Sequence, residues 1–425
     1  MRTDLSAWLV GVAALFLLWG IITREPRIFA LIIPMVVYLA LGTALGSDTH
    51  PPQVRLTRRV EKEKAIEGEE LTVSLEVENV GRSLELLEVF DRLPPQLEVV
   101  EGSRYMVTRL RRREVVEREY TVRLRAPGRH FLGPIVLRSR DLPGFFFHTV
   151  VEEDTVAVVA TPTREDLRRT QLPARRMRTW LGQIPSRSPG LGTDFWSIRD
   201  YVSGDEMRRI NWKASARLNS LFTNELEAER SGDFVLILDA REEVASGPIH
   251  ETAVVMGVRA AMSLAEMLLD ARNRVGLITM RAVLDWVYPA SGRRQFLDIV
   301  ESLVSVKPGG QWSLKHLPWI LGRFFPAGSH LIIISPMVDA STRDAILEMK
   351  ARGFDALVLS LSAVDLEMRH ATDDEMTRAA YSILKLEREA NLGLLRRFAR
   401  VADWRPGEPL ALALKEVERR MPLRP

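Results

Sequence analysis

Hydrophobic and polar residues alternate along much of the chain between residues 49 and 160. Leu71, Val73, Leu75 and Val77 are separated by single polar residues, and the pattern recurs near residue 120. A period of two is typical of strands that bury one face. Proline- and glycine-containing turns divide these runs. The pattern predicts a small antiparallel β-sandwich (Ig-like) domain over residues 49–160.

From residue 233 the pattern changes to short apolar runs that alternate with longer amphipathic segments. Residues 234–239, 275–280 and 331–335 are nearly continuous apolar runs, as expected of strands buried on both faces. A doubly wound α/β domain is therefore predicted for residues 233–425. Further strands are expected at 284–288 and 356–361, and helices at 253–269, 295–304, 345–351 and 373–401.

Two apolar runs open the chain, at residues 5–22 and 28–45. Each approaches the roughly 20 residues that cross a hydrocarbon core. We favour a transmembrane hairpin over residues 1–48 rather than a cleaved signal peptide, because a second run follows the first. Basic residues are more numerous after the second run than in the turn at 23–27. This bias predicts a multi-pass cell membrane protein with a cytoplasmic bulk.

Residues 161–232 join the two predicted domains. The first part is basic and rich in proline, as in an exposed connector. The following stretch mixes acids, bases and aromatic residues without a clear period. Ser203 and Glu206 have the spacing of a capping box, which predicts a helix that begins near Asp205.

The composition excludes several kinds of chemistry. The 425 residues include 59 basic and 56 acidic ones, and the net charge of +3 does not predict nucleic-acid binding. The absence of cysteine excludes disulfides and thiolate metal sites. The seven histidines do not pair at metal-ligand spacing, and the chain has no serine-hydrolase elbow and no phosphate-binding lysine loop. No cofactor is predicted.

An ordered series of residues lies between 190 and 217, and we call these residues the signature segment. It consists of a Gly-x-Gly-x-x-Phe lead, then Tyr-x-x-Gly-Asp, then Arg-x-Ile-x-Trp and finally Ala-Arg. The matching residues are Gly190, Gly192, Phe195, Tyr201, Gly204, Asp205, Arg208, Ile210, Trp212, Ala216 and Arg217. In this order they resemble the domain-of-unknown-function 58 family of prokaryotic membrane-associated proteins.

The resemblance implies a membrane hairpin, a β-rich domain, the signature segment and a von Willebrand factor type A-like domain. Family members are often encoded beside MoxR-type AAA ATPases and transglutaminase-like membrane proteins. The resemblance therefore implies a membrane-anchored protein-interaction scaffold or assembly factor that is not catalytic and works with a MoxR-type AAA ATPase. The expected binding residues are Phe195, Tyr201, Gly204, Asp205, Arg208, Trp212 and Arg217.

The resemblance also implies that the metal site of type A domains is degenerate here. In those domains the first strand ends in Asp-x-Ser-x-Ser, which presents oxygens to Mg²⁺. This chain has Asp239, Arg241 and Glu243 instead, so a guanidinium takes the place of the cation. Asp239 is then expected to neutralise Arg241 or to cap a helix. The other positions of the degenerate site are Gln311, Ser313, Ser335 and Asp339, with Pro336 where an acid belongs.

Two other functions stay open. The acids of residues 190–217 are candidates for an enzyme that acts on a surface or lipid-linked substrate, although neighbouring arginines favour a structural charge network. A Mg²⁺-dependent adhesion module is the third reading. In the structural interpretation, the aromatic residues and ion pairs of the signature segment lock the two soluble domains together.

Overall fold

The structure is a computed structural model of the whole chain. It describes residues 4–46, 51–140, 147–165, 167, 189–227, 233–311, 314–325, 329–337 and 339–419. The chain divides into two compact units, Met1–Thr161 and Pro162–Pro425, which are described separately below.

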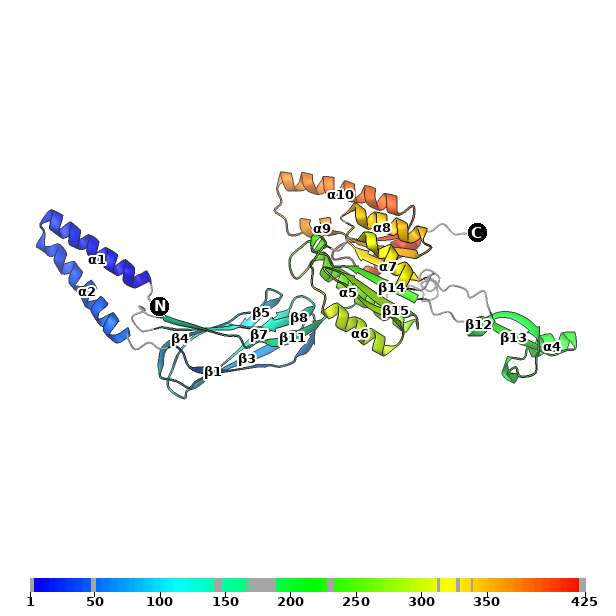
Figure 1. Cartoon of the computed structure of the whole chain (residues 1–425), viewed down its shortest axis with the longest axis horizontal. Helices are drawn as coiled ribbons and strands as arrows, with labels where there is room; N and C mark the ends of the chain where they lie inside the picture. Colours follow the sequence, from blue (N-terminus) through cyan, green and yellow to red (C-terminus); the bar gives the residue numbers. More distant parts are fainter. Residues whose placement is uncertain are drawn as a thin grey trace. The chain divides into compact units, whose positions relative to one another are not determined.

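The first unit begins with two helices, α1 (Asp4–Thr23) and α2 (Pro26–Gly46), which lie side by side (Figure 1). A membrane crossing takes about 20 apolar residues in one helix. Across the described residues, no helix has the length and apolar character that such a crossing demands. The predictions of a transmembrane hairpin over residues 1–48 and of a multi-pass cell membrane location are therefore wrong.

The rest of the first unit is built from strands in three sheets. Their orders are β1-β3-β7-β5, β10-β9-β4-β6 and β2-β11-β8. Pairing is antiparallel except between β2 and β11. The strands are β1 (Val54–Val60), β2 (Lys64–Ile66), β3 (Glu70–Asn79), β4 (Leu84–Asp91), β5 (Leu97–Gly102), β6 (Tyr105–Leu110), β7 (Val115–Leu124), β8 (Gly128–Leu132), β9 (Ile135–Arg140), β10 (Phe147–Glu152) and β11 (Val156–Thr161).

A buried ion pair lies among these strands. Arg58 of β1 donates to Asp91 of β4 through Nε at 3.1 Å and Nη2 at 2.6 Å, and neither side chain is exposed. The Tyr120 hydroxyl donates to the same carboxylate at 2.7 Å. Burial and the Asp91 charge raise the pKa of Tyr120, so it stays protonated. The cluster cross-links three strands at one point.

The second unit contains a six-stranded sheet in the order β16-β15-β14-β17-β18-β19. Its strands are parallel except β16, which pairs antiparallel with β15. The strands are β14 (Asp233–Asp239), β15 (Arg274–Met280), β16 (Leu284–Ala290), β17 (His330–Ser335), β18 (Asp355–Leu361) and β19 (Arg400–Trp404).

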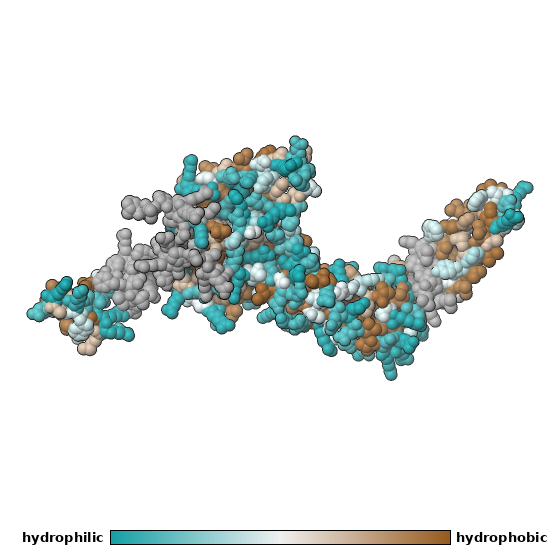
Figure 2. All heavy atoms as spheres, turned by 180° about the vertical axis from the view of Figure 1, so that it is seen from behind, coloured by the Kyte–Doolittle hydropathy of each residue, from teal (hydrophilic) through white to brown (hydrophobic). Residues whose placement is uncertain are grey.

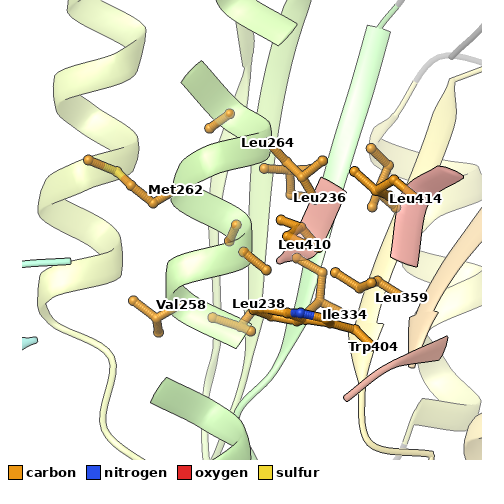
Figure 3. Close-up of a cluster of buried hydrophobic side chains, with 14 of the residues drawn as sticks. Leu236, Leu238, Val258, Met262, Leu264, Ile334, Leu359, Trp404, Leu410 and Leu414 are labelled. Carbon is orange, nitrogen blue, oxygen red and sulfur yellow. The ribbon is translucent and has the colours of Figure 1, made fainter. Parts of the chain in front are cut away.

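Helices cover both faces of this sheet (Figure 1). Side chains of α5, α6 and α11 fill one face, and those of α7, α8 and α10 fill the other. Figure 3 shows the first core, where Leu236, Ile334 and Leu359 of neighbouring strands meet α5 and Leu414 of α11. The helices are α5 (Ala253–Asp270), α6 (Arg293–Val304), α7 (Leu317–Phe324), α8 (Ala340–Ala351), α9 (Ala363–Met368), α10 (Glu375–Leu395) and α11 (Leu410–Arg419), with short 3-10 turns η2 (Glu242–Val244) and η3 (Leu314–His316).

The last helix of this unit is capped by a residue from the start of the unit. The Glu165 carboxylate accepts a hydrogen bond of 2.7 Å from the Leu410 N–H, at the first residue of α11. Backbone N–H groups at a helix start lack partners within the helix, and a carboxylate there satisfies them. The Glu165 N–H in turn donates to Ser263 Oγ in α5 at 3.0 Å. Glu165 therefore joins the start of the unit to its last helix.

The signature segment lies in a separate hairpin. β12 (Pro189–Asp200) pairs antiparallel with β13 (Phe222–Glu227), and the 3-10 turn η1 (Met207–Arg209) and α4 (Trp212–Leu218) lie between them. The predicted helix start at Asp205 is wrong, because α4 begins at Trp212 and is capped by Asn211, whose side chain accepts from the Ala214 N–H at 3.0 Å.

Candidate functional site

Polar side chains gather where two neighbouring strands of the six-stranded sheet end. Asp239 is the last residue of β14 and Ser335 is the last residue of β17. Because the strands are parallel neighbours, their carboxyl ends meet at one edge of the sheet. The Ser335 hydroxyl donates to Asp239 at 2.8 Å. Two predicted site residues are thus brought together.

Arg241 fills the space beside these residues and is only 2% exposed. Its Nε and Nη2 donate to the two oxygens of Asp239, each at 2.9 Å, which is a bidentate pair. Nη1 donates to Asp339 at 3.2 Å and also contacts the Glu243 carboxylate. Nη2 further donates to the Thr342 hydroxyl at 3.2 Å. We call these five residues the Arg241 cluster.

The contacts within the Arg241 cluster favour the charged forms of Arg241 and Asp339. Burial opposes the Arg241 charge, but hydrogen bonds to Asp239 and Asp339 outweigh it and raise the pKa of Arg241. Burial likewise works to raise the pKa of Asp339. Hydrogen bonds from Ser341, Thr342 and Arg241 outweigh that effect and hold the Asp339 pKa at about 2. Asp339 also caps α8, since it accepts from the Thr342 N–H at 3.2 Å.

The glycine loop at residues 309–310 lies against the Arg241 cluster through its backbone. Gly309 N–H donates to the Ala240 carbonyl at 3.1 Å, and the Gly310 carbonyl accepts from the Glu242 N–H at 3.0 Å. Gly310 has a φ of +71°, and a Cβ there would lie 2.1 Å from Ala282 Cα, so only glycine fits. Gln311 follows it with an exposed side chain, and Ser313 lies outside the described residues.

The chemistry of these residues does not fit a magnesium ion. Mg²⁺ needs near-octahedral oxygen ligation at short distances. Both oxygens of Asp239 already accept from the guanidinium, which lies among the other oxygens of the cluster. A divalent cation in that place would lie against a buried positive charge. The guanidinium instead supplies the positive charge that these carboxylates need.

The predicted binding residues of the signature segment lie in different parts of the hairpin. Phe195 is in β12, and its side chain lies outside the described part of the chain. Tyr201 follows β12, half-buried, and its N–H donates to the Leu221 carbonyl at 2.9 Å. Gly204 has a φ of +112° in the turn that follows, which other residues rarely adopt. Glycine is thus required at the tip of this turn.

Arg199 and Asp205 form a bidentate ion pair in the hairpin. Arg199 donates to both oxygens of Asp205 at 2.7 Å, and the Val202 N–H donates at 3.0 Å. The hydrogen bonds from Arg199, first, and from Val202 lower the pKa of Asp205 to about 2. Arg199 also donates to Glu225 of β13 at 3.1 Å. A carboxyl group with so low a pKa is a poor proton donor near neutral pH.

Sequence reasoning missed several residues of both sites. Thr342 and Ser341 were not expected beside Asp339, and Thr223 and Glu225 were not singled out in the hairpin, whereas Arg199 is one of the arginines expected to pair with the acids there. The signal for Glu225 as a partner of Arg199 is the place of these residues on adjacent antiparallel strands, which depends on the register between β12 and β13. That register could not be predicted from the sequence pattern.

The segment that connects β12 to β13 exposes apolar and cationic side chains. Trp212 is 66% exposed and Met207 is 76% exposed. Lys213 and Arg217 of α4 are also exposed, four residues apart on the same face of the helix. Arg208 is exposed beside Glu206, to which it donates at 2.7 Å. We call Met207, Arg208, Trp212, Lys213 and Arg217 the hairpin tip.

The chain combines a first unit of two helices and mainly antiparallel strands with an α/β unit in which the hairpin of β12 and β13 precedes the six-stranded sheet. Residues 197–355 match the model of a family described as protein of unknown function DUF58, and this part of the chain belongs to that family. The predicted membership of the domain-of-unknown-function 58 family is thereby confirmed. A comparison with curated proteins found no match.

Solved structures resemble parts of the chain only weakly. The cupredoxin domain of amoB from Nitrosocaldus yellowstonii covers 27% of this chain and 89% of its own, at 10% identity and a TM-score of 0.20. A FixG-related protein from Vibrio parahaemolyticus covers 26% of this chain and 98% of its own, at 11% identity and a TM-score of 0.19. At these scores neither likeness supports an argument about fold or function.

Proposed function

We propose that this protein is a non-catalytic protein-interaction scaffold or assembly factor whose hairpin tip binds a protein partner. The observation that carries the proposal is the exposed Trp212 at the start of α4, with Lys213 and Arg217 beside it. Tryptophan and arginine are enriched among residues that dominate binding energy at interfaces. A partner surface with an apolar pocket and acidic residues around it would fit this tip.

The ion pairs of Arg199 within the hairpin support the proposal. Arg199 bridges Asp205, in the turn after β12, and Glu225 of β13. The turn and the second strand are therefore cross-linked close to α4. A tip held in one conformation loses less conformational entropy on binding than a flexible one. Because Asp205 and Glu225 both pair with Arg199, a structural role for these acids is favoured over acid-base catalysis.

A MoxR-type AAA ATPase is the partner that we propose, because members of the resembled family are often encoded beside such ATPases. The Arg241 cluster supports a non-catalytic role for the α/β unit, since its carboxylates are neutralised by a guanidinium and do not fit Mg²⁺. In this proposal the α/β unit is a scaffold and the hairpin makes the contact.

The test is co-purification of the full chain with the MoxR-type ATPase encoded nearest to it, followed by a titration of the purified pair. The variant is Trp212→Ala, and the matched control is Trp319→Ala, which removes another exposed tryptophan from α7. If Trp212 is an interface anchor, the variant should weaken binding by about 2 kcal/mol or more, at least about 30-fold.

The control variant should bind like the wild type. Failure of the ATPase to co-purify with the wild type would remove the proposed partner. Equal binding by the two variants would show that the hairpin tip is not the contact surface.

A further inference from the structure

Helix α10 buries only a narrow face against the rest of the α/β unit. In α10 the buried residues are Leu392 and Leu395, both near its C-terminal end. Nearer the N-terminal end, the Tyr381 hydroxyl donates to Asp365 of α9 at 2.6 Å. Most of the other α10 side chains are exposed. The helix therefore lies on the unit with most of its circumference in solvent.

The outward face of α10 carries large apolar side chains around one exposed acid, Glu387, which lies four residues after Ile383. Met376 is 83% exposed, Ile383 is 65% exposed and Leu386 is 67% exposed, and Leu394 continues the same face. Their spacings of seven, three and eight residues follow the helical period, so they form one stripe. Figure 2 shows hydrophobic side chains interspersed with hydrophilic ones along the upper edge of the unit, where Figure 1 places α10. A helix at a water-facing surface normally turns polar residues outward.

Small residues alternate with the large ones along this stripe. Ala379, Ala380, Ala390 and Gly393 are exposed on the same face, and the space outside Gly393 is open. Small side chains let a second helix approach closely and give the large ones room to insert.

Two copies of α10 running antiparallel would match large residues with small ones. In the register that places Ile383 opposite Ala390 of the other copy, Leu394 lies opposite Ala379. Leu386 then lies opposite Glu387 of the other copy, so the two Leu386 side chains meet on one side of the two-fold axis and the two Glu387 side chains lie on the other. A symmetric pair uses the same surface twice, so each match is made twice.

The charges at the two ends of α10 also favour an antiparallel pair over a parallel one. Asp373, Asp374 and Glu375 are at the N-terminal end, and Arg396 and Arg397 follow the C-terminal end. An antiparallel pair brings the acidic end of each copy to the basic end of the other, whereas a parallel pair brings like charges together.

We propose that the outward face of α10 binds α10 of a second copy of this chain as an antiparallel helix pair. With 21 residues in α10, the pair is about 30 Å long. A contact of about 10 Å by 30 Å is smaller than the roughly 800 Å² per partner of a standard interface, so the dimer is weak, with a Kd in about the micromolar range. This surface is separate from the hairpin tip, and the proposal does not depend on the ATPase.

Sedimentation of the full chain between about 1 and about 100 µM tests whether it self-associates. The variant Ile383→Glu places a charge in the stripe and should raise the Kd at least about tenfold. The control is Leu297→Glu, which adds the same charge at another exposed leucine, on α6. Both variants keep α1 and α2, so a difference between them reports on α10.

Cross-linking tests the geometry, because the natural chain has no cysteine. Leu386→Cys should form a disulfide-linked dimer on mild oxidation, since two such positions lie near the two-fold axis. Met376→Cys should not cross-link to itself. A wild-type chain that is monomeric at every concentration, or equal cross-linking by both cysteine variants, would overturn the proposal.

Discussion

Removing the Arg241 side chain should destabilise the α/β unit strongly. The side chains of Arg241 and Asp239 are only 3% and 1% exposed. In Arg241→Ala the Asp239 carboxylate would stay buried without its bidentate partner, and breaking a buried ion pair in this way costs about 3–5 kcal/mol. Urea unfolding followed by circular dichroism measures the loss as a lower midpoint with an unchanged slope.

Two other substitutions serve as comparisons for the stability loss of Arg241→Ala. Arg241→Lys keeps the charge but loses the planar fork, so its loss should lie between those of the wild type and Arg241→Ala. Glu243→Gln changes a carboxylate that is 44% exposed, and it should cost less than about 1 kcal/mol. The double variant Asp239→Asn with Arg241→Ala should cost less than the sum of the two single changes, because the residues are in contact.

The same reasoning predicts the response to ions. Low millimolar guanidinium should raise the melting temperature of Arg241→Ala, since it can fill the vacated place, and Mg²⁺ should leave the wild type unchanged. An Arg241→Ala protein that loses less than about 1 kcal/mol would refute the view that the guanidinium neutralises the Arg241 cluster. A rise in wild-type stability with Mg²⁺ would instead support the adhesion-module alternative.

The contacts of Asp91 and Asp205 predict two further effects on stability. Tyr120→Phe should lower the free energy of unfolding by about 2 kcal/mol in urea titrations, because the hydroxyl donates to the charged and buried Asp91; a loss no larger than that of a surface substitution would count against the buried cluster. The Asp205 pKa is about 2 in the folded hairpin and 3.8 ordinarily, so its stabilisation is complete above about pH 4 and is lost as the pH falls towards 2. The protection factor of the Val202 amide, which is the exchange rate corrected for the intrinsic rate at each pH, should fall over that window in the wild type, and Asp205→Asn should abolish this dependence.

The strands of the α/β sheet could be predicted from the sequence because burial on both faces leaves a continuous apolar run. The run at 234–239 is β14, and the run at 331–335 lies within β17. The predicted helix at 373–401 was too long, since α10 ends at Leu395 and β19 begins at Arg400. A five-residue strand directly after an amphipathic helix adds too few apolar positions to break the helical pattern.

The candidate sites were predicted only in part. The pairing of Asp239 with Arg241 follows from two oppositely charged residues at a strand end, and the structure has it. The approach of Asp339 depends on β14 and β17 being neighbours, which residue spacing does not reveal. The helix expected at Asp205 is absent, and the Glu206 carboxylate of the expected capping box accepts from Arg208 instead. The spacing of Ser203 and Glu206 alone therefore did not specify a helix start.

The cap that Glu165 provides to α11 determines where a stable fragment of the α/β unit can begin. Glu165 and Leu410 are separated by 245 positions, so the carboxylate leaves the ribosome long before the helix that needs it. A truncated protein that starts at β14 would complete the sheet but would leave the first turn of its last helix without that acceptor. Any excised α/β fragment intended for crystallisation or binding work should therefore begin at or before Pro162, upstream of the hairpin, rather than at the first strand of the sheet.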